Sequence, residues 1–403
     1  MKGKRKALFV IIIACLLAVP AFAAFDTDGW GARPVGMGGA FTAVCDDANS
    51  IFHNAAGTAR LKHMEGIFMH GIPFAGLDLK VWDDDTLEFR DVNLGLNYLA
   101  LTYPLGAYGT VGLGWINFNA TDLYSENAIS LNYALQVVDS EKRRRRTGNA
   151  IDLYSGLNLK LISHAYSLDD NDRAAGDAVF GGDGTLTSKA GITADLGLLG
   201  VINKEISLGL SIKNAIPANV GIYEKEYLLP QVGIGAAYRY KDIKPAIDIV
   251  YKFGVPKIQR FNVGIGCEAW FLSKMIGVRA GLNLDWIGAG FSFSKNSEML
   301  GMQVDYSFNY PYLVRAQYGT HRLALTVKFD REGVLDMERV AELGELGRKD
   351  KKANTKQYYD QGVQYYKQGE YKKAIRAWQK ALLLNPSNNK VKALIEKAEK
   401  KLE

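Results

Sequence analysis

The chain has 403 residues, 23% of them charged and 11% aromatic, with a formal net charge of +6, and this length allows more than one domain. Its basic character lies at the two ends, because residues 2–6 carry four positive charges and residues 330–403 carry 17 basic against 12 acidic residues. The remaining body, residues 24–329, carries about −3. The basic composition therefore gives no support to nucleic-acid binding by the body, and we expect no nucleic-acid partner.

Residues 1–23 are predicted to be a signal peptide. A basic start is followed by an apolar run over residues 7–19 and a small-x-small site at residues 21–23, so we expect cleavage after Ala23. An acylated Cys15 is the alternative, but the apolar run continues past it. No later segment approaches the roughly 18 consecutive apolar residues of a transmembrane helix. Export without such an anchor leaves a secreted soluble protein or an outer-membrane β-barrel.

Residues 24–60 are rich in glycine and small polar residues. Four glycines within nine residues, at positions 31, 36, 38 and 39, allow backbone conformations and close packing that other residues cannot reach. Asp46 and Asp47 follow, and then a turn at residues 54–57. The two carboxylates could bind a cation, gate the segment through a lumenal arginine, or accept hydrogen bonds from nearby backbone amides. Short acidic side chains favour the last of these.

Residues 61–329 alternate between apolar and small or polar residues, which is the period of a β-strand. In residues 259–271, for example, Phe261, Val263 and Ile265 alternate with polar residues and glycine. We distinguish about thirteen segments of the roughly 9–11 residues that cross a bilayer as a tilted strand. Because a membrane sheet must close, we predict a mainly β fold, an antiparallel transmembrane β-barrel of about 14 strands. The predicted lumen-facing charged residues are Asp152, Lys160, Arg239, Arg260, Glu268 and Asp305.

The C-terminal part differs in kind from the barrel. Residues 330–353 form a charged linker, and residues 354–403 are predicted to be a small all-α module with one tetratricopeptide repeat and a capping helix. The signature positions are Tyr358, Gln361, Gly362, Tyr365, Ala374, Trp378, Ala381 and Pro386. The residues predicted to bind a partner, on a basic stripe that could equally be a solvated face, are Tyr358, Tyr365, Lys372, Arg376 and Lys380.

Other polar clusters carry weaker signals. The basic run at residues 142–146 could contact lipopolysaccharide phosphates or be a solvated hairpin tip. The acidic runs at residues 83–85 and 169–172 lack the spacing of a calcium loop, and the five histidines show no zinc spacing. No nucleophile motif such as G-x-S-x-G occurs. We therefore expect no enzyme activity, no cofactor, no catalytic residues and no metal site.

Residues 31–57 resemble the N-terminal signature of the PorV/PorQ family, which belongs to the wider FadL-type outer-membrane barrels. Residues 208–214, 230–239, 261–270 and 277–281 resemble successive strands of that family in the same order. Ala55 stands where the family usually has proline. The resemblance covers residues 26–329 and implies that residues 24–60 form a plug inside the lumen. The residues predicted to act in the plug or its gating are Gly36, Gly38, Gly39, Asp46, Asp47 and Asn54.

Two functions remain open at this stage. The first is binding or passage of hydrophobic molecules, such as long-chain fatty acids, through the plugged lumen. The alternative is a docking or assembly protein, similar to the PorV-type cargo receptors of type IX secretion. Both predict a barrel in the lipid bilayer of the outer membrane. An even strand number after a periplasmic plug predicts that the C-terminal module lies in the periplasm, where the repeat would bind a protein partner.

Overall fold

The computed structural model of the chain describes residues 29–77, 80–83, 88–121, 123–140, 150–167, 187–222, 225–255, 260–297, 300–312, 314, 317–329, 351–384 and 388–401. The predicted signal peptide, the basic run at residues 142–146, the acidic run at residues 169–172 and nearly all of the linker lie outside these residues. So do Asp84 and Asp85 of the first acidic run. The chain divides into two compact units, of which the first contains the barrel and the second the C-terminal helices.

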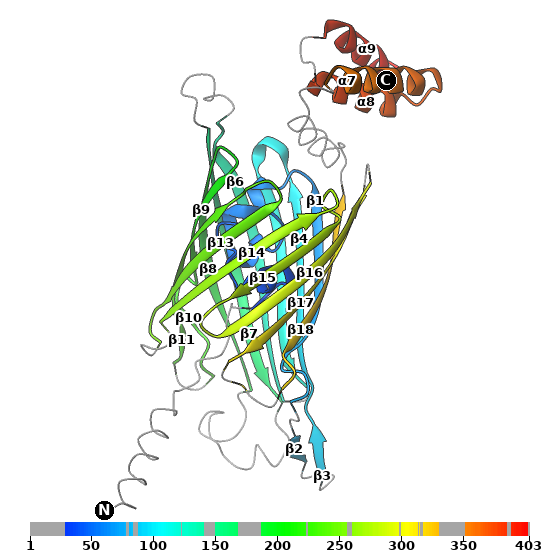
Figure 1. Cartoon of the computed structure of the whole chain (residues 1–403). Helices are drawn as coiled ribbons and strands as arrows, with labels where there is room; N and C mark the ends of the chain where they lie inside the picture. The colour runs from blue at the N-terminus through cyan, green and yellow to red at the C-terminus, as the bar shows by residue number, and fades with distance from the viewer. Residues whose placement is uncertain are drawn as a thin grey trace, which may run out of the picture. The chain divides into compact units, whose positions relative to one another are not determined.

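Within the described residues, fourteen antiparallel strands close into a barrel (Figure 1). They follow one another around the wall in chain order, and β1 pairs with β18 to complete the circle. The predicted fold class and strand number are thus confirmed. The strands are β1 (Met64–Ile72), β4 (Leu94–Pro104), β5 (Thr110–Ala120), β6 (Tyr124–Val138), β7 (Ile151–Tyr166), β8 (Ser188–Ile202), β9 (Ile206–Lys213), β12 (Gln231–Tyr238), β13 (Ile243–Lys252), β14 (Phe261–Phe271), β15 (Ile276–Leu282), β16 (Trp286–Asn296), β17 (Leu300–Pro311) and β18 (Thr320–Phe329).

The outer face of the wall is apolar and the inner face is polar or small. On β14, Phe261, Ile265 and Phe271 are exposed, whereas Asn262 and Glu268 on the opposite face are buried. Neighbouring strands continue this pattern around the barrel. A surface with this much exposed apolar area is stable only against lipid, so the pattern marks the face that contacts the bilayer.

The two ends of the barrel differ in the length of their connections. At the end where β1 begins, residues 203–205, 239–242 and 272–275 form short turns, and residues 139–150 form a longer connection. At the other end, residues 283–285 form a short connection, and longer connections carry the hairpins β2 (Lys80–Asp83)–β3 (Glu88–Asp91) and β10 (Ala218–Asn219)–β11 (Tyr227–Leu228). Short turns are typical of the periplasmic end of outer-membrane barrels. β18 ends at that same end, because the number of strands is even.

The segment before β1 folds inside the barrel, where Figure 1 shows it in blue. It contains α2 (Ala32–Gly36), α3 (Ser50–His53) and the 3₁₀ helix η1 (Ala55–Arg60), and residues 29–61 are called the plug below. Its apolar side chains, among them Ile51 and Phe52, pack against lumenal residues of β1, β4, β5 and β7. Ala218 and Val220 of the β9–β12 connection join the same cluster. Plug and connection therefore share one apolar core with the wall.

The C-terminal unit contains α7 (Lys351–Lys367), α8 (Tyr371–Leu384) and α9 (Asn389–Glu399). Its core is centred on the fully buried Trp378. Gly362 is required beneath this indole, because a Cβ there would lie 2.3 Å from Trp378 Nε1. Gly369, with φ +78°, lies in the turn between α7 and α8. Among the described helices, none combines the length and apolar character needed to cross a membrane.

Candidate functional site: the plug and its contacts with the wall

Glycines on the inner face of the wall form a socket for the plug. At each of them an added Cβ would lie 2.1–2.6 Å from the nearest plug atom, a distance that real Cβ contacts essentially never show. They come from six strands, so the plug touches wall backbone on many sides of the lumen. We call this set the glycine socket: Gly156, Gly197, Gly209, Gly264, Gly266, Gly281 and Gly288.

The socket explains a feature that the sequence left ambiguous. The alternation pattern places these glycines on the face opposite the apolar residues but does not show what they contact. In the structure they lie against plug backbone. The carbonyl oxygen of Met37, for example, lies 2.1 Å from where a Cβ of Gly266 would be. Glycine is needed here because only its missing side chain allows two backbones to approach so closely.

Arg33 of α2 joins the plug to the wall through buried ion pairs. Its Nε and Nη2 donate to the two carboxylate oxygens of Glu268 on β14, each at 2.7 Å. Its Nη1 donates to Asp46 at 2.6 Å and to Asp47 at 2.8 Å, both in the plug. Paired hydrogen bonds of this kind between guanidinium and carboxylate fix the geometry as well as the charge.

Two cations of the wall extend these pairs. Arg279 on β15 donates to Glu268 at 2.6 Å and lies 3.2 Å from Asp305 on β17. Lys244 on β13 donates to Asp46 at 2.5 Å. Burial alone would raise the pKa of Asp46, but the positive charges of Arg33 and Lys244 outweigh it and hold that pKa well below its ordinary range. The Arg33 network, as we name it, consists of Arg33, Asp46, Asp47, Lys244, Glu268, Arg279 and Asp305.

Further polar side chains of the wall hold plug backbone groups. Asp248 on β13 accepts hydrogen bonds from the N–H groups of Phe41 and Thr42, at 2.9 and 2.7 Å. Glu65 on β1 accepts one from the Ala48 N–H at 2.9 Å. These bonds satisfy backbone groups that would otherwise be buried without partners. The plug is therefore held in place from several sides of the barrel.

The residues predicted for the plug all take part in these contacts or in the turns that shape them. Gly38 has φ +65°, and a Cβ there would lie 2.4 Å from the Leu282 nitrogen. Asn54 donates to the carbonyl oxygens of Thr42 and Leu198, each at 3.0 Å. Asp46 and Asp47 pair with Arg33, and Asp47 also accepts from the Asn49 N–H at 2.9 Å. In the described part of the chain, no cluster of residues could hold a metal ion.

Gly36 and Gly39 complete the predicted plug residues. Gly36 lies close to Gly290 on β16, where an added Cβ would be 3.1 Å from the Gly290 Cα. Gly39 has φ +79°, so the turn at this position favours glycine even though space is available.

Of the six charged residues predicted to face the lumen, four lie in strands of the barrel and two lie in connections between strands. Among the four, Glu268 and Asp305 belong to the Arg33 network, and Lys160 pairs with Asp195 of β8 at 2.6 Å. Asp152 lies near the start of β7 and accepts a hydrogen bond from the Ser140 N–H at 2.9 Å. The other two residues lie in connections beyond the ends of their strands: Arg239 after β12 and Arg260 before β14.

Sequence reasoning missed several groups that hold the plug. Arg33 lies within residues 31–57, and Arg279 lies within residues 277–281, two segments that resemble parts of the PorV/PorQ family. The missed residues are Arg33, Glu65, Lys244, Asp248 and Arg279. A signal was present in the alternation pattern, which puts the wall residues on the lumenal face, but it does not show which of them meet the plug.

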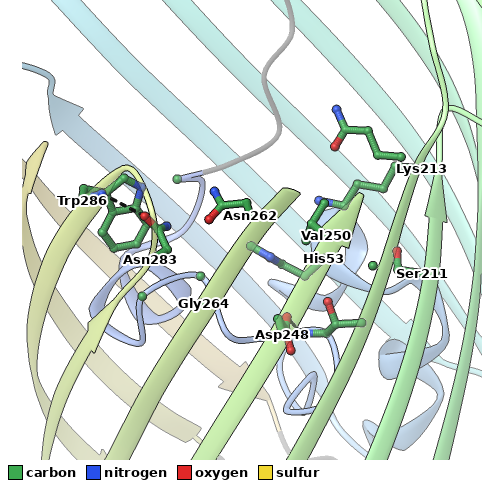
Figure 2. A pocket seen from close by; sticks show the side chains of 15 residues that line it. His53, Ser211, Lys213, Asp248, Val250, Asn262, Gly264, Asn283 and Trp286 are labelled. Atoms are coloured by element: carbon green, nitrogen blue, oxygen red, sulfur yellow. Dashed lines mark hydrogen bonds between the residues drawn. The ribbon is translucent and has the colours of Figure 1, made fainter. Parts of the chain in front are cut away.

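Small cavities lie between the plug and the wall, and two of them bear on ligand binding. One, of about 40 Å³, is lined by His53, Asp248, Asn262 and Asn283 among others (Figure 2). The other, of about 30 Å³, is more apolar and lies beside Phe52. Since a water molecule needs about 10–15 Å³, each cavity has room for only a few water molecules. Ligand pockets are far larger, at about 300–1,000 Å³.

In the C-terminal unit, the residues predicted to bind a partner take two different positions. Tyr358 and Tyr365 are half-buried and pack against the core around Trp378. Lys372 is exposed, and Arg376 and Lys380 are half-buried on α8. The tyrosines therefore have a packing role, and the basic residues form the outer surface.

Comparison of the sequence with protein families finds two matches. Residues 91–327 match the family described as type IX secretion system membrane protein PorP/SprF, and residues 355–388 match the tetratricopeptide repeat. The chain belongs to the PorP/SprF family. The repeat lies where the sequence pattern predicts it. The more specific resemblance to PorV/PorQ is not confirmed. A comparison with curated proteins gives no match.

Solved structures show the same fold. The toluene transporter TbuX of Ralstonia pickettii is 11% identical, with a TM-score of 0.50 over 76% of this chain and 99% of that chain. The monoaromatic hydrocarbon channel CymD is 13% identical, with a TM-score of 0.48 over 76% and 98%. A FadL homologue of Pseudomonas aeruginosa is 12% identical, with a TM-score of 0.46 over 76% of this chain and 98% of that chain. At such low identity the likeness to TbuX establishes the fold and carries no information about substrate.

Proposed function

We propose that this chain is a sealed outer-membrane barrel that serves as an anchor for protein docking in type IX secretion. The observation that carries the proposal is the fit of the plug, in which the glycine socket and the Arg33 network join plug and wall around the lumen. Membership of the PorP/SprF family supports the secretion context. On this proposal the barrel wall holds the protein in the membrane, and exposed parts of the chain contact other proteins.

Opening such a lumen would be costly. Withdrawal of the plug would separate Arg33 from Glu268 and Asp46 from Lys244, and breaking one buried ion pair costs about 3–5 kcal/mol. The hydrogen bonds from the plug to Asp248 and Glu65 would be lost as well. Because the plug also contacts glycine backbone at close range, small rearrangements within the socket create little space. A stable closure fits an anchor better than a channel that opens often.

The tetratricopeptide repeat supports the docking role. Repeats of this kind provide protein-binding surfaces, whereas passage of a small molecule through the wall needs no such module. The even strand number brings the chain back to the end with short turns, which supports a periplasmic position for the repeat. The partner would then be a periplasmic protein or the periplasmic part of a membrane protein.

A second candidate function is binding of a hydrophobic molecule within the barrel. It is favoured by the apolar cluster between the plug and the wall, where Trp30, Phe52 and Ile162 lie beside the smaller cavity. A ligand of the size of a fatty acid would require this cluster to open. We rank this function second because the cavity is small and the groups around it are packed together.

Deletion of residues 351–403 tests the two functions against each other. The docking role predicts that the truncated barrel still folds in the outer membrane but no longer retains its partner or supports secretion by the host. Uptake of a hydrophobic molecule would not need the repeat. Normal secretion by the truncated protein, together with loss of uptake in a strain without the barrel, would overturn the docking role in favour of transport.

A further inference from the structure

The C-terminal module is strongly basic. Residues 351–401 contain 13 lysines and arginines against four acidic residues, a net charge of +9. The barrel body carries no such excess. A field of this sign attracts acidic partners and raises their rate of association. Two modules of this charge would repel one another, which argues against stacking of a second copy on the open face of the repeat.

Part of this charge forms a line along α8. Lys372, Arg376 and Lys380 follow at intervals of four residues, so they share one face of the helix. Leu383, three residues beyond Lys380, is 44% exposed. We call Lys372, Arg376, Lys380 and Leu383 the α8 stripe. It combines a row of cations with an apolar contact at its end, which suits an acidic amphipathic segment.

One lysine of the α8 stripe is held over a tyrosine ring of α7. Lys380 Nζ lies 5.8 Å from the centre of the Tyr358 ring. The neighbouring Lys373, outside the stripe, lies over Tyr365 and pairs with Glu370 at 3.1 Å. Contacts of this kind between a cation and a ring restrict the lysine side chain. Less entropy is then lost when a carboxylate binds.

We propose that the α8 stripe binds an acidic polypeptide segment of a partner protein. This inference rests on the proposed docking function and adds the chemistry of the partner to it. An anionic lipid surface is the competing ligand, but membrane-surface helices bury a broad apolar face. On α8 the larger apolar side chains, such as Trp378, are already buried in the module core.

The test uses the full-length protein in bilayer discs of a zwitterionic lipid. The probe is a short fluorescent helical peptide of glutamate and leucine, and its control has glutamine in place of each glutamate. The test variant is Lys372→Gln/Arg376→Gln/Lys380→Gln. The matched control Lys392→Gln/Lys397→Gln/Lys400→Gln removes the same charge from exposed positions of α9 and its C-cap.

We expect the wild-type protein to bind the acidic peptide, to bind it less well as salt is added, and to bind the glutamine peptide weakly. The α8 variant should bind at least about tenfold more weakly, equal to about 1.4 kcal/mol, and the α9 variant should change much less. If the triple variant does not fold, Lys372→Gln alone, at an exposed position, should still weaken binding. Equal loss in both triple variants would overturn the inference.

Binding to anionic vesicles but not to the acidic peptide would also overturn it, in favour of a lipid surface. None of these failures would decide the docking role itself, which depends on the deletion of residues 351–403. A protein that loses its partner on deletion but ignores the peptide would retain the proposed function and reject its acidic chemistry.

Discussion

Replacing Arg33 with methionine tests whether the ion pairs hold the plug. The change removes the cation shared by Glu268, Asp46 and Asp47. Asp47 would then keep its hydrogen bonds to Asn49 but lose its salt bridge to Arg33.

The expected cost follows from what the other two carboxylates retain. Glu268 keeps Arg279 at 2.6 Å, and Asp46 keeps Lys244 at 2.5 Å. Breaking a buried ion pair costs about 3–5 kcal/mol. Since two of the three carboxylates keep a partner, we expect the lower end of this range, about 3 kcal/mol.

The assay is limited proteolysis of the plug in the folded barrel, together with the free energy of unfolding in detergent. Arg33→Met should expose the plug to cleavage and lower stability. Arg239→Met is the control, because the Arg239 side chain is 42% exposed and its guanidinium lies 4.0 Å from Asp46. An exposed pair of this kind contributes about 0–1 kcal/mol, so the control should behave as the wild type does.

A double variant gives the coupling between the two partners. Arg33→Met/Glu268→Gln removes both members of the paired interaction, so its cost should be smaller than the sum of the two single changes by more than about 1 kcal/mol. Additive costs, or a plug in Arg33→Met as resistant to protease as the wild type, would refute the reasoning that this network holds the plug.

Three further predictions concern the socket, the pH and the repeat. Gly281→Ala places a Cβ 2.2 Å from plug backbone and should lower the free energy of unfolding by about 1–3 kcal/mol. Gly233→Ala, with its nearest contact at 3.5 Å, should be tolerated. Equal melting temperatures of the two variants would contradict the close contact between glycine socket and plug. Because the folded-state pKa of Asp46 is depressed, its stabilisation is present above its ordinary pKa of about 3.9 and is lost as the pH falls further. Protease sensitivity of the plug should therefore rise on acidification, and Asp46→Asn should weaken that dependence; the same pH profile in both proteins would count against it. Trp378→Ala should cost about 3–5 kcal/mol and unfold the C-terminal helices while the barrel stays folded. Loss of helical signal in far-ultraviolet circular dichroism and unchanged heat-modifiable gel mobility would show this, whereas intact helices would show that the core lies elsewhere.

The barrel could be predicted from sequence because two physical constraints act together. Alternation such as that of Phe261 and Ile265 with Asn262 gives strands with one apolar face, and a bilayer permits a sheet only if it closes. The tetratricopeptide repeat could be predicted because its small and aromatic residues occupy fixed positions, as Gly362 beneath Trp378 illustrates. Both inferences use local patterns that tolerate errors in exact boundaries.

The plug contacts could not be derived in this way. Arg33 and Glu268 are 235 residues apart, and alternation tells which face a strand residue occupies but not its height along the barrel axis. The same limit applies to Gly266 and Gly281, whose lumenal positions could be predicted although their contact with Met37 could not. Register between strands and plug decides these contacts, and register depends on the whole fold.

A disulfide between plug and wall tests the central claim, that the protein works with its lumen closed. Thr42→Cys/Gly233→Cys is suitable, because a Cβ at position 233 would lie 3.5 Å from Thr42 Oγ1. In a disulfide, the Cβ of one cysteine lies roughly 3 Å from the sulfur of the other, and Oγ1 marks where that sulfur would be. Cys45 and Cys267, both free, would be replaced by alanine. The measurement is secretion and partner retention by a host carrying the tethered protein, with and without reductant. We predict no difference between the two conditions, whereas loss of secretion in the oxidised protein with recovery on reduction would show that the plug must move.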